Sequence, residues 1–106
     1  IAELKSLGIT QIIIDPGFGF GKTIDQNYSL LKNMHAFNNF RLPILAGMSR
    51  KSMVTKVLNV NSENALNGTT VLNTLALLKN ASILRVHDVI EAKQVITLVE
   101  QYRKVE

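Results

Sequence analysis

Three apolar blocks of the chain end in residues whose side chains could do chemistry. The first block ends at Asp15, and the second ends at Gly47 and is followed by Ser49, Arg50 and Lys51. Arg85 and His87 close the third. If the blocks are parallel strands, their carboxyl ends share one edge, which is where α/β proteins place their sites. We therefore expect an electropositive pocket in which a single carboxylate faces several cationic or titratable groups.

Arg85 and His87 suit the binding of a diphosphate. They are two residues apart, so in extended backbone their side chains point to the same side. Burying a guanidinium without a partner costs several kcal/mol, so an arginine inside an apolar block favours a functional role. Together the two groups could grip a diphosphate and assist its departure. His87 precedes Asp88, and a satisfied loop histidine is the alternative interpretation.

The segment 47–52, Gly-Met-Ser-Arg-Lys-Ser, joins the end of a strand to the start of a helix. Exposed N–H groups at such a junction, with a hydroxyl at Ser49 and two cations, predict an anion site. Arg50 suits a planar carboxylate or phosphate, whereas Lys51 suits a single point contact.

The glycine-rich loop that follows Asp15 matches neither common phosphate-binding motif. Pro16 occupies the position where a P-loop needs its leading glycine, and the glycine spacing differs from that of a dinucleotide fingerprint. We interpret the loop as one whose backbone approaches a flat ligand, with Phe18 and Phe20 able to cover that ligand. Asp15 could also simply cap the turn before Pro16.

The elements that must position these groups alternate along the chain. Near-continuous apolar blocks, typical of strands buried on both faces, occupy residues 11–15, 43–47 and 82–86. Helical spacing predicts helices at about 25–38, 50–58, 62–79 and 88–102. This alternation indicates parallel strands with right-handed crossovers, either in an open α/β domain or in an arc of a barrel. The pattern alone does not separate the two.

The ends of the last two helices carry recognisable signals. Ser62 is the expected N-cap of the third helix, and Asn80 is the expected left-handed residue that ends it. Asp88 with Glu91 resembles a capping box, and we expect the fourth helix to bury one stripe that ends at Tyr102.

Composition excludes several protein classes. With 106 residues, of which 46% are hydrophobic, the chain is at most one small domain and is not intrinsically disordered. The absence of cysteine excludes a disulfide scaffold and a thiol nucleophile. The net charge of +4 is scattered rather than gathered into a stripe, which argues against nucleic acid. No apolar run approaches the roughly 18 residues of a membrane span, so we expect no membrane partner.

Three segments together resemble one known family. Asp-Pro-Gly-Phe-Gly-Phe-Gly-Lys at 15–22, the 47–52 segment, and Arg-Val-His-Asp-Val at 85–89 are similar to the dihydropteroate synthases, a pterin-binding TIM-barrel family, in order and spacing. The similarity extends over essentially the whole chain. It implies that residues 1–106 are the C-terminal part of a single α/β domain, namely the last three units of a (β/α)8 barrel that is incomplete as given.

The resemblance also implies a reaction. It would be a transferase of folate biosynthesis that joins 4-aminobenzoate to (7,8-dihydropterin-6-yl)methyl diphosphate, giving 7,8-dihydropteroate and diphosphate, with sulfonamides as competitors. Mg²⁺ would be held through the substrate diphosphate and a residue outside this chain. The full-length enzyme would be a cytoplasmic homodimer. We expect the isolated chain to be inactive, because missing strands would leave two open sheet edges.

Matched to the family motifs, some residues would bind the pterin and its diphosphate. Asp15 would accept hydrogen bonds from the amino and ring N–H groups of the pterin, and Lys51 would contact its carbonyl and ring-nitrogen edge. Arg85 would stack on the pterin and reach toward the diphosphate that His87 binds. The resemblance thus implies that the residues active in catalysis are Lys51, Arg85 and His87.

The other substrate would meet a second group of residues. Ser49 would receive the carboxylate of 4-aminobenzoate with Arg50 nearby, and Phe20 would line its channel. Gly19 and Gly47 would let the backbone approach the ligands.

Two alternatives remain open on the sequence. A methyltetrahydrofolate-handling barrel would need the aspartate-centred pterin site without the diphosphate grip of Arg85 and His87. The chain could also be a ligand-binding or inactive fragment.

Overall fold

The computed structural model describes residues 12–19, 21–48 and 52–105. Helices and strands alternate along it, as the sequence predicts. The order is α2 (Ile24–Lys32), the 3₁₀ helix η1 (Met34–Phe40), β1 (Leu45–Ala46), α3 (Ser52–Leu58), the 3₁₀ turn η2 (Ser62–Asn64), α4 (Leu66–Leu78), β2 (Ile83–Leu84) and α5 (Val89–Lys104).

Three parallel segments form the centre of the fold. β1 pairs with β2 so that Ala46 lies opposite Leu84, and an isolated parallel bridge joins Ile14 to Ile44. The three predicted strands are therefore present and parallel. The first strand is reduced to the one bridge at Ile14. Among the described residues, this segment is hydrogen-bonded to a neighbouring segment on one side only.

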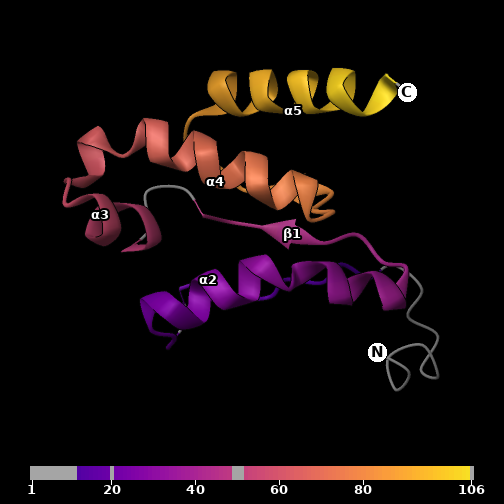
Figure 1. Ribbon diagram of the computed structural model, residues 1–106, viewed down its shortest axis with the longest axis horizontal. Helices are drawn as coiled ribbons and strands as arrows, with labels where there is room; N and C mark the ends of the chain where they lie inside the picture. The colour runs from indigo at the N-terminus through magenta and orange to yellow at the C-terminus, as the bar shows by residue number, and fades with distance from the viewer. Residues whose placement is uncertain (1–11, 20, 49–51, 106) are drawn as a thin grey trace.

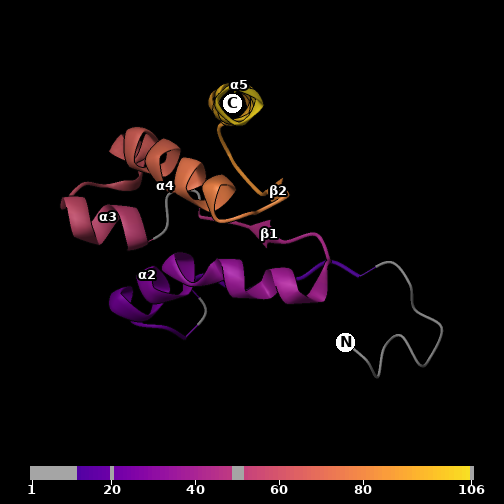
Figure 2. The same ribbon diagram turned by 45° about the vertical axis from the view of Figure 1, so that its right-hand side comes forward.

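Helices cover both sides of these strands. Figure 1 shows β1 between α2 on one side and α4 on the other, with α5 lying along α4. Figure 2 confirms this layering from a second direction. Buried side chains from the strands and from α2, α3 and α4 form the main core, which includes Leu31, Met34, Ile44, Ala46, Met53, Val54, Leu72 and Ala76. A smaller cluster of Leu77, Val95 and Val99 joins α4 to α5.

The helix predicted at 25–38 is interrupted. Thr23 caps α2 in a reciprocal capping box with Gln26, and α2 ends at Lys32. The side-chain amide of Asn33 donates to the carbonyl of Ser29 at 2.9 Å, a local bond that competes with helix continuation. The chain continues as the 3₁₀ helix η1, which still buries Met34.

The N-cap expected at Ser62 is wrong. The side chain of Asn61 instead accepts from the backbone N–H of Asn64 at 3.1 Å and caps η2, and α4 begins only at Leu66. A glycine lies where α4 meets α3. A Cβ on Gly68 would lie 2.5 Å from Val54 Cγ1, so α3 and α4 can pack this closely only with glycine there.

α4 ends as predicted. Asn80 has a left-handed backbone with φ of 75°. Its N–H donates to the carbonyl of Leu77 at 3.0 Å, and the N–H of Ala81 donates to Ala76 at 3.0 Å, which is the Schellman pattern. The turn directs the chain back into β2.

The predictions for α5 hold in part. Asp88 occupies the N-cap position but its side chain makes no capping bond, so the expected capping box is wrong. Val95 and Val99 are buried, whereas Tyr102 is 73% exposed. Arg103 instead binds the carbonyl of Leu77 near the end of α4, and Tyr102 lines an open groove that it shares with Leu78. None of the helices that the structure describes is long and apolar enough to cross a membrane.

A side-chain hydrogen bond joins α2 to α3. The hydroxyl of Tyr28 donates to the backbone carbonyl of Met53 at 2.6 Å. Burial raises the pKa of Tyr28 above its ordinary value of 10.0, because the phenolate loses solvation there. The phenol is therefore a neutral donor at physiological pH.

We expect Asn80→Ala to destabilise the protein by about 1 kcal/mol relative to Asn80→Gly, because a Cβ disfavours the left-handed backbone and glycine does not. Urea unfolding of both variants in the full-length protein measures the difference. Equal free energies of unfolding would show that the turn does not depend on this backbone conformation.

We expect the stability contributed by Tyr28 to be lost at high pH. Its folded-state pKa is raised, so the contribution is fully present below pH 10.0 and declines as pH rises through the folded-state pKa. Urea unfolding between pH 8 and 11.5 should therefore show the wild type losing its advantage over Tyr28→Phe. A difference between the two proteins that stays constant to pH 11.5 would contradict the assignment.

Candidate functional site

The pairing of the strands brings three of the predicted site positions to one edge. Asp15 follows the bridged Ile14, Gly47 follows Ala46, and Arg85 follows Leu84, the partner of Ala46. The backbone N–H of Arg85 donates to the carbonyl of Ala46 at 2.9 Å, which fixes β2 against the end of β1. Segments up to 70 residues apart in the sequence (15 to 85) thus end side by side.

Gly47 is buried against the side chain of Arg85. A Cβ built on Gly47 would lie 2.8 Å from Arg85 Nη2 and 2.9 Å from Nε. Gly47 therefore makes room for the guanidinium of Arg85. From the sequence, it was expected to make room for a ligand. Arg85 itself is exposed, so the expected desolvation cost does not apply: the side chain lies along the rim of the strand ends rather than inside the core.

Asp15 has the turn-capping role that the sequence left open. Its Oδ1 accepts from the backbone N–H of Gly17 at 2.9 Å, and the residue is exposed. Because a carboxylate has about four acceptor positions on its two oxygens, capping does not exhaust its capacity to bind a ligand.

Two side chains hold the backbone of the glycine-rich loop in place, one from the end of the loop and one from α2. Lys22 Nζ donates to the carbonyl of Gly17 at 2.9 Å, and the N–H of Gly19 donates to Asn27 Oδ1 at 2.7 Å. Gly19 is exposed with φ of 87°, a conformation that glycine adopts without strain. Phe18 is 1% exposed and belongs to the main core, so its expected role of covering a ligand is wrong: its ring anchors the loop instead.

The remaining predicted site residues divide into two sets. His87 is exposed and lies two residues beyond Arg85. Phe20, Ser49, Arg50 and Lys51 lie outside the described residues. Their neighbours are placed, since Met48 is buried at the end of the second strand and α3 begins at Ser52.

Sequence reasoning missed two residues of α2 near this edge. Asn27 is fully buried and holds Gly19, while Tyr28 holds α3. Asn27 lies four residues before the buried Leu31, so a polar residue on the apolar stripe was the available signal.

The described residues do not offer a metal site of their own. No group of three or more histidine, cysteine, aspartate or glutamate side chains comes together within 12–19, 21–48 and 52–105.

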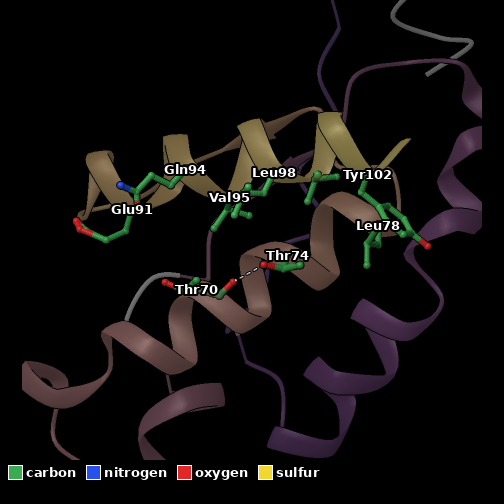
Figure 3. Close-up of a pocket in the computed structure, with 9 residues that line it drawn as sticks. Thr70, Thr74, Leu78, Glu91, Gln94, Val95, Leu98 and Tyr102 are labelled. Atoms are coloured by element: carbon green, nitrogen blue, oxygen red, sulfur yellow. Dashed lines mark hydrogen bonds between the residues drawn. The ribbon is translucent and has the colours of Figure 1, made fainter. Parts of the chain in front are cut away.

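A separate groove of about 430 Å³ lies between α4 and α5. In Figure 3 side chains from both helices point into it, including Thr74, Leu78, Leu98 and Tyr102. Its lining is mainly apolar and contains none of the predicted substrate-binding residues, so we do not assign the reaction to it.

Comparison with known proteins identifies the relatives of this chain. The profile of the pterin-binding enzymes matches residues 1–87. Dihydropteroate synthase of Escherichia coli K12 is 44% identical over 102 residues, which cover 94% of this chain and 36% of the relative. The Haemophilus influenzae dihydropteroate synthase is 45% identical over 89 residues, which cover 82% and 32%.

Solved structures show the same relationship. Yersinia pestis dihydropteroate synthase matches with a TM-score of 0.93 at 40% identity, over 98% of this chain and 44% of that one. The Coxiella burnetii dihydropteroate synthase, in complex with pteroic acid, matches with a TM-score of 0.92 at 41% identity, over 99% and 40%. The parallel strands and helices described above are thus part of a TIM barrel, as expected.

The chain spans about a third of the length of the curated relatives that it matches. That a single domain extends over residues 1–106 stays a prediction. The matched profile and the identity to relatives over most of the chain establish its membership: the chain belongs to the pterin-binding enzyme family.

Proposed function

We propose that the full-length protein is a dihydropteroate synthase that condenses 4-aminobenzoate with (7,8-dihydropterin-6-yl)methyl diphosphate. The observation that carries the proposal is the shared edge at which Asp15, Gly47 and Arg85 lie, because each belongs to a different family-like motif. The 44% identity to the Escherichia coli enzyme over 94% of the chain supports the same reaction.

The reaction forms one bond and breaks another. The amine nitrogen of 4-aminobenzoate attacks the methylene carbon of the pterin, and the bond from that carbon to the diphosphate oxygen breaks. Diphosphate leaves with the electron pair, and the attacking amine loses a proton. The chain therefore needs to stabilise a departing polyanion and a methylene with cationic character, without a strong general base.

Cations at the strand ends are suited to that task. We assign the leaving diphosphate to Arg85 and His87, since charge-assisted hydrogen bonds to phosphate oxygens are the strong ones. Lys51 is assigned to the carbonyl edge of the pterin. Asp15 is assigned to the amino and ring N–H groups of the pterin, because a carboxylate can accept hydrogen bonds from both.

Binding of 4-aminobenzoate is assigned to the two glycine-containing loops. Ser49 and Arg50 would receive its carboxylate, and Phe20 would line its channel. Gly19 offers an exposed backbone beside that channel. The assignments of Phe20, Ser49, Arg50 and Lys51 rest on their places in the motifs.

Further properties belong to the same proposal. Mg²⁺ would be held through the substrate diphosphate and a residue outside this chain, and no step here is routed through it. We propose a cytoplasmic homodimer. The exposed apolar residues Leu98 and Tyr102 of α5, at 70% and 73%, support an interface on that helix.

The full-length protein incubated with both substrates and Mg²⁺ should release diphosphate and form dihydropteroate. Arg85→Ala should lower kcat/KM by about 30-fold or more, since the loss of a charged hydrogen bond to the diphosphate costs about 2 kcal/mol or more. A coupled assay that detects diphosphate measures the release by the wild type and the kcat/KM of the variant. Absence of product, or activity indifferent to this substitution, would refute the proposal. Pterin binding without preference for the diphosphate ester would favour the methyltetrahydrofolate-type alternative.

Gly47→Ala should raise the KM for the pterin diphosphate by about tenfold, because its new methyl group must displace the Arg85 guanidinium. The backbone at Gly47 is not left-handed, so the change is steric. Ala46→Gly is the matched control, since it weakens the neighbouring strand position without entering the space of Arg85. In the Arg85→Ala background, Gly47→Ala should have little further effect. Full additivity of the two substitutions would contradict the contact.

A further inference from the structure

Two adjacent residues of α2 reach two different parts of the site edge. Asn27 contacts the glycine-rich loop after the first strand, and Tyr28 contacts the first turn of α3 after the second strand. α2 is therefore placed to set these two segments relative to each other.

Asn27 uses both ends of its carboxamide. Its Oδ1 accepts from the N–H of Gly19 at 2.7 Å, and its Nδ2 donates to the carbonyl of Thr23 at 3.0 Å. The side chain is fully buried. The same Thr23 carbonyl also accepts from the backbone N–H of Asn27 at 3.0 Å, so it keeps a partner when the side chain is changed. The contact that depends on this side chain is the one to Gly19.

Tyr28 makes the corresponding contact on the next residue. Its hydroxyl donates to the carbonyl of Met53 at 2.6 Å, and its ring packs against the main core. Met53 is the second residue of α3 and is fully buried. The raised pKa keeps the phenol protonated, so the donor is present throughout the physiological range. Replacing tyrosine with phenylalanine removes this bond and leaves the ring.

We propose that Asn27 and Tyr28 are positioning residues of the transferase, Asn27 for the 4-aminobenzoate side of the site and Tyr28 for the pterin side. The assignment follows from what each contact holds, and it rests on the proposed function. Gly19 directly precedes Phe20, the residue assigned to the channel for 4-aminobenzoate. The bond from Tyr28 to Met53 holds α3, and α3 begins directly after Lys51, the residue assigned to the pterin edge.

A purely structural role would leave a different signature. Asn27 and Tyr28 lie in one short helix, so a general loosening of α2 would affect both substrates together. Gln26 provides the matched control because its Oε1 accepts from the N–H of Thr23 at 2.9 Å within the capping box and touches neither segment. Gln26→Ala should weaken the same helix without moving the site.

The experiment measures kcat and both KM values for the full-length enzyme, together with its melting temperature. Asn27→Leu should raise the KM for 4-aminobenzoate by about tenfold and leave that for the pterin diphosphate within about twofold. Tyr28→Phe should raise the KM for the pterin diphosphate by about fivefold and change that for 4-aminobenzoate less. Gln26→Ala should lower the melting temperature and leave both KM values within about twofold.

The outcomes separate the two claims. If the wild type forms dihydropteroate but both variants change the two KM values by the same factor, or change only the melting temperature, the positioning roles are refuted. If the wild type forms no dihydropteroate, the proposed function fails and this inference fails with it. Should Asn27→Leu not fold, Asn27→Ser, whose side chain is too short to reach Gly19, makes the same comparison, and Tyr28→Phe stands independently.

Discussion

The hydrogen-bonded register of three parallel segments is the constraint on which the site depends. The N–H of Leu45 donates to the carbonyl of Ile14 at 2.8 Å, and that of Arg85 donates to Ala46 at 2.9 Å. Because successive strand residues face opposite sides, a slip of one residue would turn every side chain at the edge to the other face. In the observed register, Asp15, Gly47 and Arg85 follow paired residues and share one edge. The packing of Arg85 against Gly47 is a direct consequence.

Buried neighbours hold the exposed groups of this edge in place. Phe18 and Met48, at 1% and 0% exposure, lie in the segments that follow the first two strands and belong to the same core. Burying a side chain of this size contributes roughly 1.5–3 kcal/mol, far more than an exposed loop gains from its own contacts. Asn27 and Tyr28 of α2 add hydrogen bonds to Gly19 and Met53. The loops thus combine accessible backbone at Gly19 with a rigid base, which suits a site that must orient two flat substrates.

The features that were predictable from the sequence are those set by local pattern. Continuous apolar blocks identify the strands, and helical spacing identifies α4 and α5, including the left-handed Asn80. Two kinds of feature were not predictable: those decided by competing side-chain hydrogen bonds, and those made between residues far apart in the sequence. Asn33 ends α2 through its side chain, Asn61 caps in place of Ser62, and the bond from Tyr28 to Met53 joins residues that no periodicity relates. Phe18 was misassigned because an aromatic residue between glycines has the same local pattern whether it covers a ligand or anchors a loop.

The central claim is that the ends of the three segments together form the pterin site. A crystal structure of the full-length protein with a pterin diphosphate analogue tests this claim most directly. The account predicts that the pterin ring lies at the shared strand edge, with the Asp15 carboxylate within hydrogen-bonding distance of its N–H groups and the Arg85 guanidinium against its face. A pterin bound away from this edge, or an Arg85 side chain turned away from the ligand, would contradict it.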